Sequence, residues 1–249
     1  MSSSNRHGER LARWSESKQV GTPPRPAATV VLLRDGSSGP EALMLRKNSR
    51  IAFGGMWVFP GGRVDAEDRV GDDELAGARR AAVREAREES GLVVDERGLV
   101  PFSHWTPPPI TPKRFLTWFF VARAPTSAVT IDGGEIHEHT WLSPAEALVQ
   151  RDKGEIELAP PTFVTLWELA RDPSVESALS RARAREPERF ETVIGRVDGG
   201  AVAMWHGDAG YGEAQPDLPG PRHRLWMQDD GWRYERSDAP ERLSGPRRG

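Results

Sequence analysis

The sequence predicts an α/β fold (α+β) in which a mixed β-sheet lies between layers of helices. Residues 27–34 and 41–47 are rich in β-branched and apolar side chains and flank a Gly- and Ser-containing turn. A nearly continuous apolar and aromatic run covers residues 115–122, as expected for a strand buried on both faces. Helices are indicated by the Glu- and Arg-rich segment 77–89 and by apolar spacing in 162–170. Strands interleaved with helices favour an α/β/α sandwich.

The remaining elements follow from turn and capping signals. Residues 57–59 form a short predicted strand that enters a Pro-Gly-Gly turn, and residues 136–142 form a later one. Ser143-Pro144-Ala145-Glu146 is a capping box with proline at the first helical position, so a helix begins there and continues through Val149. A more polar helix is expected at 174–185.

The predicted organisation has three parts. Residues 1–26 end in a proline-rich stretch and are expected to be a flexible segment. Residues 27–190 form the main domain with its following helices. Residues 191–249 are a β-rich extension with a hairpin of 224–228 and 232–235. We expect this extension to pack on the domain and cover a sheet edge, with a lid or a dimer contact as alternatives.

Composition excludes several classes of function. The 249 residues include 34 Lys+Arg and 37 Asp+Glu, and the net charge of −3 disfavours nucleic acid as a partner. The chain has no cysteine, which excludes disulfides and thiolate metal sites. It also lacks an apolar run of about 20 residues. With no apolar signal segment either, we expect a cytoplasmic protein that makes no membrane contact.

Three glutamates share one face of the predicted helix. Glu85, Glu88 and Glu89 stand at positions i, i+3 and i+4, and Gly91 provides a left-handed helix stop. Their mutual repulsion is relieved by a hard divalent cation, which prefers oxygen ligands, so the pattern predicts a site for Mg²⁺ or Mn²⁺. Arg84 is placed to pair with Glu88. The alternative for the glutamates alone is a solvated, salt-bridged helix face.

The segment from Arg84 to Leu92 resembles the second half of the Nudix hydrolase signature, Arg-Glu-apolar-any-Glu-Glu-any-Gly-apolar, at every fixed position. In the first half of the signature, the family has Glu six positions after the glycine. In this chain, Asp68 stands six positions after Gly62. Fifteen residues then separate Asp68 from Arg84, eight more than the signature's seven. Other acidic residues near that position are Asp65, Glu67 and Glu74.

Further segments resemble one branch, the peroxisomal coenzyme A diphosphatases and their bacterial relatives. These segments are 58–65, 113–120, 132–135 and 141–148, and the resemblance covers roughly residues 27–170. A coenzyme A-specific element of a neighbouring branch is loosely matched by Arg46, Arg50, Gly54 and Gly55.

The resemblance implies a Nudix-type fold and a metal-dependent hydrolase that cleaves the diphosphate linkage of a nucleoside diphosphate-linked compound. Coenzyme A or acyl-coenzyme A is the first substrate expected; ADP-ribose or NADH is the alternative. A second alternative is a non-catalytic nucleotide sensor. The expected partner is a small nucleotide-containing molecule, and a homodimer is a possible assembly.

Specific residues follow for each role. Glu85, Glu88 and Glu89 are the expected ligands of Mg²⁺ or Mn²⁺, with the Gly62 or Gly61 carbonyl as a further oxygen. The general base is expected to be Glu85 or a late acidic residue, Glu135 or Glu138. Expected substrate contacts are Arg46, Arg50, Arg114, Lys113 and Trp57.

Overall fold

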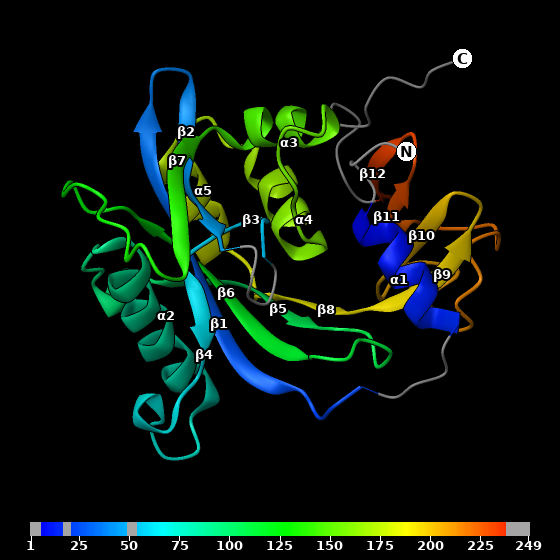
Figure 1. Ribbon diagram of the computed structural model, residues 1–249, viewed down its shortest axis with the longest axis horizontal. Helices are drawn as coiled ribbons and strands as arrows, with labels where there is room; N and C mark the ends of the chain where they lie inside the picture. The colour runs from blue at the N-terminus through cyan, green and yellow to red at the C-terminus, as the bar shows by residue number, and fades with distance from the viewer. Residues whose placement is uncertain (1–5, 17–20, 49–53, 238–249) are drawn as a thin grey trace. The chain divides into compact units, whose positions relative to one another are not determined.

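The computed structural model describes residues 6–16, 21–48 and 54–237 (Figure 1). The chain forms two compact units. The larger unit contains Pro24–Trp105 and Phe115–Arg189, and the smaller contains Met1–Pro23, Thr106–Arg114 and Phe190–Gly249. This division differs from the predicted organisation, because an internal segment and the N-terminal segment both group with the C-terminal region.

A mixed sheet forms the centre of the larger unit. Strand β1 (Arg25–Gly36) pairs antiparallel with β2 (Gly39–Lys47) and parallel with β6 (Phe115–Arg123). The sheet order is β3-β2-β1-β6-β5-β8, with β4 added to β1 and β7 added to β2. The other strands are β3 (Trp57–Val58), β4 (Gly61–Arg63), β5 (Val100–Thr106), β7 (Ile136–Leu142) and β8 (Glu188–Glu191).

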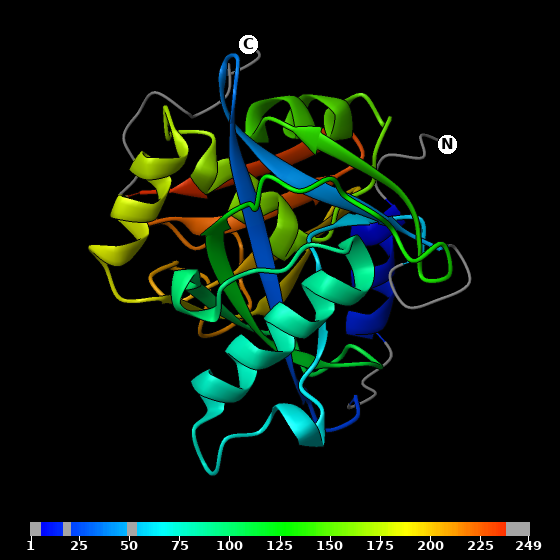
Figure 2. The same cartoon turned by 90° about the vertical axis from the view of Figure 1, so that its left-hand side faces the viewer.

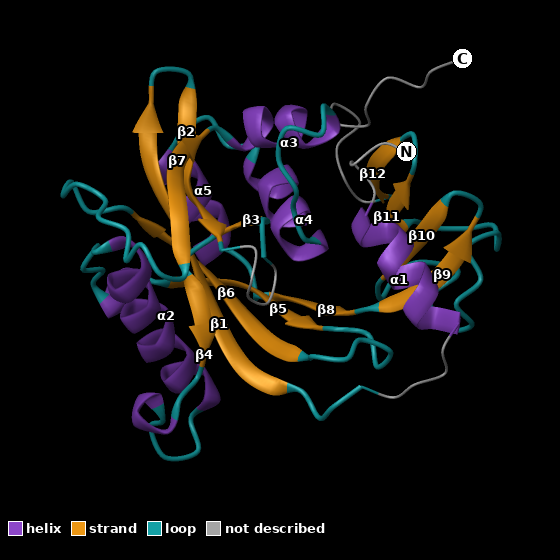
Figure 3. Ribbon diagram, viewed as in Figure 1, coloured by secondary structure: helices purple, strands orange, loops and turns teal. Residues whose placement is uncertain are grey.

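Helices cover both faces of this sheet. Helix α2 (Glu74–Ser90) packs on one face against β1, β4 and β6. The opposite face carries α3 (Pro144–Asp152), α4 (Pro160–Leu169) and α5 (Val175–Arg183), as Figures 1 and 3 show. Figure 2 looks at the sheet from the side of α2. The predicted α/β/α sandwich with a mixed sheet is confirmed.

Small side chains bring α2 close to the sheet. The alanines on its inner face are buried in one apolar cluster with alternate residues of β1, namely Ala28, Val30 and Leu32. Val31 and Leu33, which point the other way in the strand, are also fully buried. Both faces of the central strand are therefore core, as its unbroken apolar run predicts. The α2 alanines in the cluster are Ala78, Ala81, Ala82 and Ala86.

Both ends of α2 are fixed by capping groups. The Asp73 side chain accepts a hydrogen bond from the Ala76 N–H at the start of the helix. Gly91 follows the last turn at φ 70°, a left-handed conformation that glycine adopts without strain, and its N–H donates to Arg87 O. The predicted stop is confirmed, so Glu85, Glu88 and Glu89 lie in the last two turns.

The smaller unit has its own antiparallel sheet in the order β12-β11-β10-β9. Helix α1 (Arg6–Glu16) packs against three of these strands, within the segment expected to be flexible. The predicted hairpin is confirmed as β11 and β12, joined by Asp229 and Asp230. The strands are β9 (Val193–Val197), β10 (Gly200–Met204), β11 (His223–Gln228) and β12 (Gly231–Arg236).

None of the helices in the described part of the chain combines the length and apolar character needed to cross a membrane.

Candidate active site

A glycine turn brings backbone against the acidic end of α2. Strand β4 pairs with β1 through Gly61 and Gly62, and the Gly61 N–H donates to Glu89 Oε2 at 2.8 Å. A Cβ on Gly62 would collide with the Glu85 carboxylate. The missing side chain of Gly62 thus lets the Glu85 carboxylate lie against the turn, and the Gly61 N–H binds the Glu89 carboxylate to it.

Glu89 is the most buried carboxylate of the predicted metal ligands, with 3% of the residue exposed. Its second oxygen, Oε1, accepts from Lys47 Nζ at 3.1 Å. Burial raises the pKa of Glu89 to about 7, although the charge of Lys47 and the Gly61 N–H both act to lower it. Burial therefore destabilises the charged form of Glu89 more than Lys47 and the Gly61 N–H stabilise it.

Lys47 joins the predicted ligand Glu89 to the predicted base Glu135. It ends strand β2, its side chain is 12% exposed, and its Nζ lies 2.6 Å from Glu135 Oε1. Burial acts to lower the pKa of Lys47, but the two carboxylates outweigh this effect and raise it. Sequence reasoning missed Lys47, and the only local signal is its place directly after Arg46 at the end of a predicted strand.

Glu135 lies in a turn that is held by hydrogen bonds on both sides. The Asp132 carboxylate accepts from the Glu135 N–H and the Ile136 N–H, each at 2.9 Å. The Asn48 N–H donates to Glu135 O at 2.8 Å. The turn before β7 is thus fixed to the end of β2, next to Lys47. Of the two late acidic candidates, Glu135 is the one that this arrangement connects to Glu89.

Arg84 organises the other carboxylates. Its Nη1 donates to Glu85 Oε1 at 2.9 Å and to Glu88 Oε2 at 3.0 Å, which confirms the predicted pair at i+4. Its Nε and Nη2 donate to the two oxygens of Asp68 at 3.2 and 2.9 Å, and Nη2 also reaches Arg63 O. This fork fixes the guanidinium in one orientation.

Asp68 occupies the acidic position that the sequence left open. It is 5% exposed, and although burial acts to raise its pKa, hydrogen bonds from Arg84 and the Asp65 N–H hold that pKa below its usual value. Asp65 and Glu67 are exposed, and Glu74 accepts instead from Trp118 Nε1. Burial and two hydrogen bonds from Arg84 thus distinguish Asp68 from the three alternatives, since the exposed Asp65 carboxylate lies 3.7 Å from Arg84.

The predicted metal ligands are neighbours, but their carboxylates accept hydrogen bonds from the side chains of Arg84 and Lys47. Burial raises the pKa of Glu85, Arg84 acts to lower it, and the nearby Glu88 acts to raise it. Among the residues that the structure describes, no three His, Cys, Asp or Glu side chains form a ready metal cluster. Arg84 and Lys47 engage the carboxylates instead. The donor set still suits a hard dication, because it consists of carboxylate oxygens beside a glycine backbone.

Three of the predicted substrate contacts, Arg46, Arg114 and Trp57, either have partners within the protein or are buried. Arg46 faces Trp57 across the β2–β3 pair, yet it forms an ion pair with Glu138 at 3.2 Å, and Trp57 is only 7% exposed. Arg114 belongs to the smaller unit, where its Nη2 donates to Pro107 O. Arg50 lies outside the described residues.

The α/β/α sandwich and the acidic helix end at a glycine turn define a class of hydrolase that acts on phosphoanhydrides. A family model described as NUDIX domain matches residues 23–162, more than half of the chain. The chain therefore belongs to the NUDIX family and is a Nudix hydrolase. Its activity is diphosphatase cleavage of nucleoside diphosphate-linked compounds.

Solved structures of other proteins are similar to this chain, and the first one given below supports the fold. A NUDIX hydrolase from Alicyclobacillus acidocaldarius is 24% identical with a TM-score of 0.59, over 64% of this chain and 96% of that one. A MutT NUDIX hydrolase from Burkholderia pseudomallei is 19% identical with a TM-score of 0.46, over 59% of this chain and 98% of that one. No curated protein matches this chain. The first of these matches bears on the fold alone, and neither match identifies the coenzyme A branch.

Proposed function

We propose that this Nudix hydrolase cleaves the diphosphate of coenzyme A or an acyl-coenzyme A with Mg²⁺ or Mn²⁺, releasing 3′,5′-ADP and a phosphopantetheine. The observation that carries the proposal is the approach of Glu85 and Glu89 to the Gly61-Gly62 turn. It supports a phosphate site because carboxylates beside exposed backbone bind hard cations, and those cations bind phosphate oxygens.

Each residue has a stated part in the proposed reaction. Glu85, Glu88 and Glu89 would hold the dication, with the Gly62 carbonyl as a further oxygen; when bound, the dication neutralises phosphate charge and acidifies water. Arg84 orients Glu85 and Glu88, and the Gly61 N–H orients Glu89. Glu135 is the proposed proton acceptor, with Glu85 as the alternative.

The choice of coenzyme A rests on sequence resemblance. Arg46, Arg50 and Arg114 are the proposed contacts to the diphosphate oxygens, and Trp57 is a further proposed contact to the substrate. ADP-ribose and NADH present the same diphosphate to the same carboxylates, so the substrate panel must include them. Loss of a signature carboxylate would be the hallmark of the sensor alternative; Glu85, Glu88 and Glu89 are all present, which disfavours the sensor, while the eight-residue insertion keeps it as an alternative.

The test is phosphoanhydride hydrolysis over coenzyme A, acetyl-coenzyme A, ADP-ribose and NADH, with Mg²⁺ or Mn²⁺. We expect turnover of coenzyme A by the unmodified protein and loss of at least 100-fold in Glu88→Gln/Glu89→Gln. Glu155→Gln, an exposed glutamate of the same unit, is the matched control and keeps full activity. Preferred turnover of ADP-ribose or NADH would refute the coenzyme A assignment, and nucleotide binding without turnover would favour a sensor.

A further inference from the structure

One ammonium joins two parts of the site that come from distant positions in the chain. Lys47 Nζ contacts Glu89 on α2 at 3.1 Å and Glu135 before β7 at 2.6 Å. We call this arrangement the Lys47 bridge. Neither carboxylate is a neighbour of Lys47 in sequence, since 42 and 88 residues separate the pairs.

The bridge occupies the position where Glu89 would bind a cation. The Gly61 N–H donates to one Glu89 oxygen, and the Lys47 ammonium donates to the other. The Glu89 side chain is 4% exposed, so loss of Lys47 without replacement would leave a buried carboxylate unpaired, which is costly. Departure of Lys47 from Glu89 is therefore least costly when a metal ion or a proton takes its place.

Lysine is suited to such an exchange. Its charge sits at the end of a flexible four-carbon stem, unlike the planar fork by which Arg84 is fixed to Asp68. The turn with Glu135 does not need the ammonium, because Asn48 and Asp132 hold its backbone. Movement of Lys47 is thus a side-chain event that leaves β2 and the turn in place.

We propose that Lys47 exchanges partners when the site binds its metal: it leaves Glu89 as that carboxylate binds the dication, and its ammonium then binds the diphosphate of the substrate. The inference rests on the proposed metal-dependent function and adds Lys47 as a substrate-binding residue. It also implies an order, with the dication before the nucleotide, because the ammonium is engaged by carboxylates until then.

The first measurement is Mn²⁺ affinity of the full-length protein without nucleotide, from the electron paramagnetic resonance signal of free Mn²⁺. In Lys47→Met the dication no longer competes with an ammonium for Glu89, so we expect Mn²⁺ to bind about three- to tenfold more tightly. Lys47→Arg keeps a competing cation and stays near the unmodified protein. Equal or weaker Mn²⁺ binding by Lys47→Met would overturn the exchange.

The second measurement is calorimetric binding of α,β-methylene-ADP, whose diphosphate analogue resists hydrolysis. With saturating Mn²⁺, Lys47→Met should bind it about tenfold more weakly, since one charge-assisted contact is lost. With EDTA, the variant and the unmodified protein should bind it equally. Equal affinity in the presence of Mn²⁺ would exclude Lys47 as a phosphate contact.

Controls separate this inference from the proposed function. Lys153→Met changes an exposed lysine at the end of α3 and should match the unmodified protein in both assays. If Lys47→Met does not fold, Lys47→Gln replaces it as a polar neutral variant. Failure of the unmodified protein to bind Mn²⁺ would defeat the metal-dependent function itself, whereas normal Mn²⁺ binding with no response to Lys47 substitution would defeat only the exchange.

Discussion

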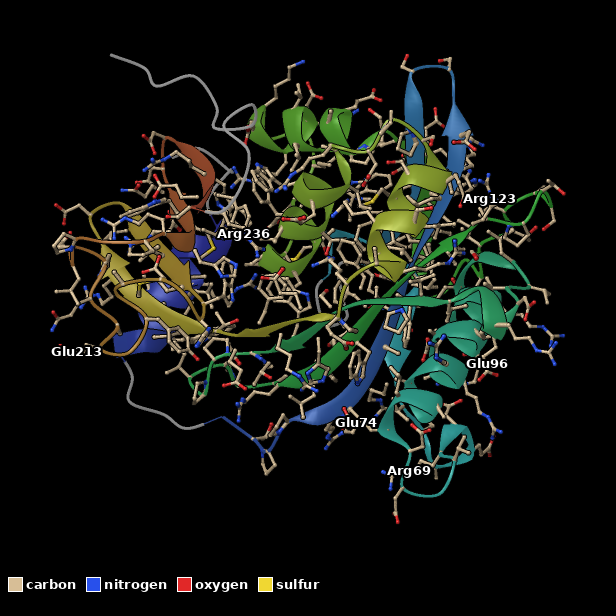
Figure 4. All side chains as sticks on the ribbon, turned by 180° about the vertical axis from the view of Figure 1, so that it is seen from behind. Arg69, Glu74, Glu96, Arg123, Glu213 and Arg236 are labelled. Atoms are coloured by element: carbon tan, nitrogen blue, oxygen red, sulfur yellow. The ribbon has the colours of Figure 1, made fainter. Side chains whose placement is uncertain are left out.

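Arg84 and Asp68 form a two-point ion pair, with Nη2 to Oδ2 at 2.9 Å and Nε to Oδ1 at 3.2 Å, although fifteen residues lie between them. The residues between them form the loop 69–73 and the first part of α2, 74–83. Figure 4 labels Arg69 in this loop and Glu74 at the first position of the helix. The insertion therefore leaves intact the contact that positions Arg84 beside Glu85 and Glu88.

Asp68→Asn tests this contact. The variant leaves Arg84 with one neutral partner in place of a carboxylate, so we expect a loss of about 1–3 kcal/mol in the free energy of unfolding and at least a tenfold loss in kcat. Urea denaturation and steady-state hydrolysis measure the two effects. Asp65→Asn is the control, because the exposed Asp65 carboxylate lies 3.7 Å from Arg84. Similar effects of both substitutions would contradict the role of Asp68.

Gly62→Ala tests the approach of the turn to Glu85. The three atoms nearest to the added Cβ all belong to the Glu85 carboxyl group, at the far end of a flexible side chain, so we expect little change in thermal stability. Displacement of the carboxylate should lower kcat by about 10- to 100-fold, since small misplacements of reacting groups are costly. Gly98→Ala, where a Cβ meets open space, is the matched control. Full activity in Gly62→Ala would show that Glu85 needs no close backbone.

Removal of divalent metal tests the donor set as a whole. Dialysis against EDTA should abolish hydrolysis, and Mg²⁺ or Mn²⁺ should restore it, because carboxylates alone cannot neutralise a diphosphate. In Glu88→Gln/Glu89→Gln the same additions should restore at most a few per cent of activity. Turnover that persists in EDTA would be incompatible with the proposed chemistry.

The smaller unit should show a specific acid sensitivity. Arg224 Nη2 lies 2.6 Å from Asp208 Oδ1, and both side chains are fully buried. The Asp208 carboxylate also accepts hydrogen bonds from Arg224 Nε, the His223 N–H and the Gly210 N–H. Burial acts to raise the pKa of Asp208, but these donors outweigh it and hold the pKa below 3.8. The stabilisation is therefore complete above pH 3.8 and lost as the pH falls through the lower, folded-state value.

Asp208→Asn measures that contribution. At pH 7 we expect a loss of about 3–5 kcal/mol in the free energy of unfolding, because the substitution leaves a buried guanidinium without its counter-charge. The difference from the unmodified protein should narrow below pH 3.8. Urea denaturation from pH 7 to pH 3 provides the comparison, with the exposed Asp217→Asn as control. A difference that stays constant over this range would disprove the linkage.

Periodic patterns in the sequence were sufficient for much of the fold. β1, β2, β6 and β7 were predicted within a few residues, because their side chains carry strong β-forming and apolar signals. Strand β5 was missed, since Pro101, Ser103 and His104 interrupt its pattern. Strand β4 contains two glycines, so only pairing with β1 makes it a strand. Helix α1 was also missed, and it packs against the sheet of the smaller unit.

The sequence by itself determined the face that carries Glu85, Glu88 and Glu89 and the stop at Gly91, because helical spacing and capping act within a few residues. Only the tertiary structure decided that Asp68 is the partner of Arg84 and that Lys47 lies between Glu89 and Glu135. Such contacts depend on how strands and helices pack over separations of 16 to 88 residues, and ion pairs at that range leave no periodic signal in a single chain.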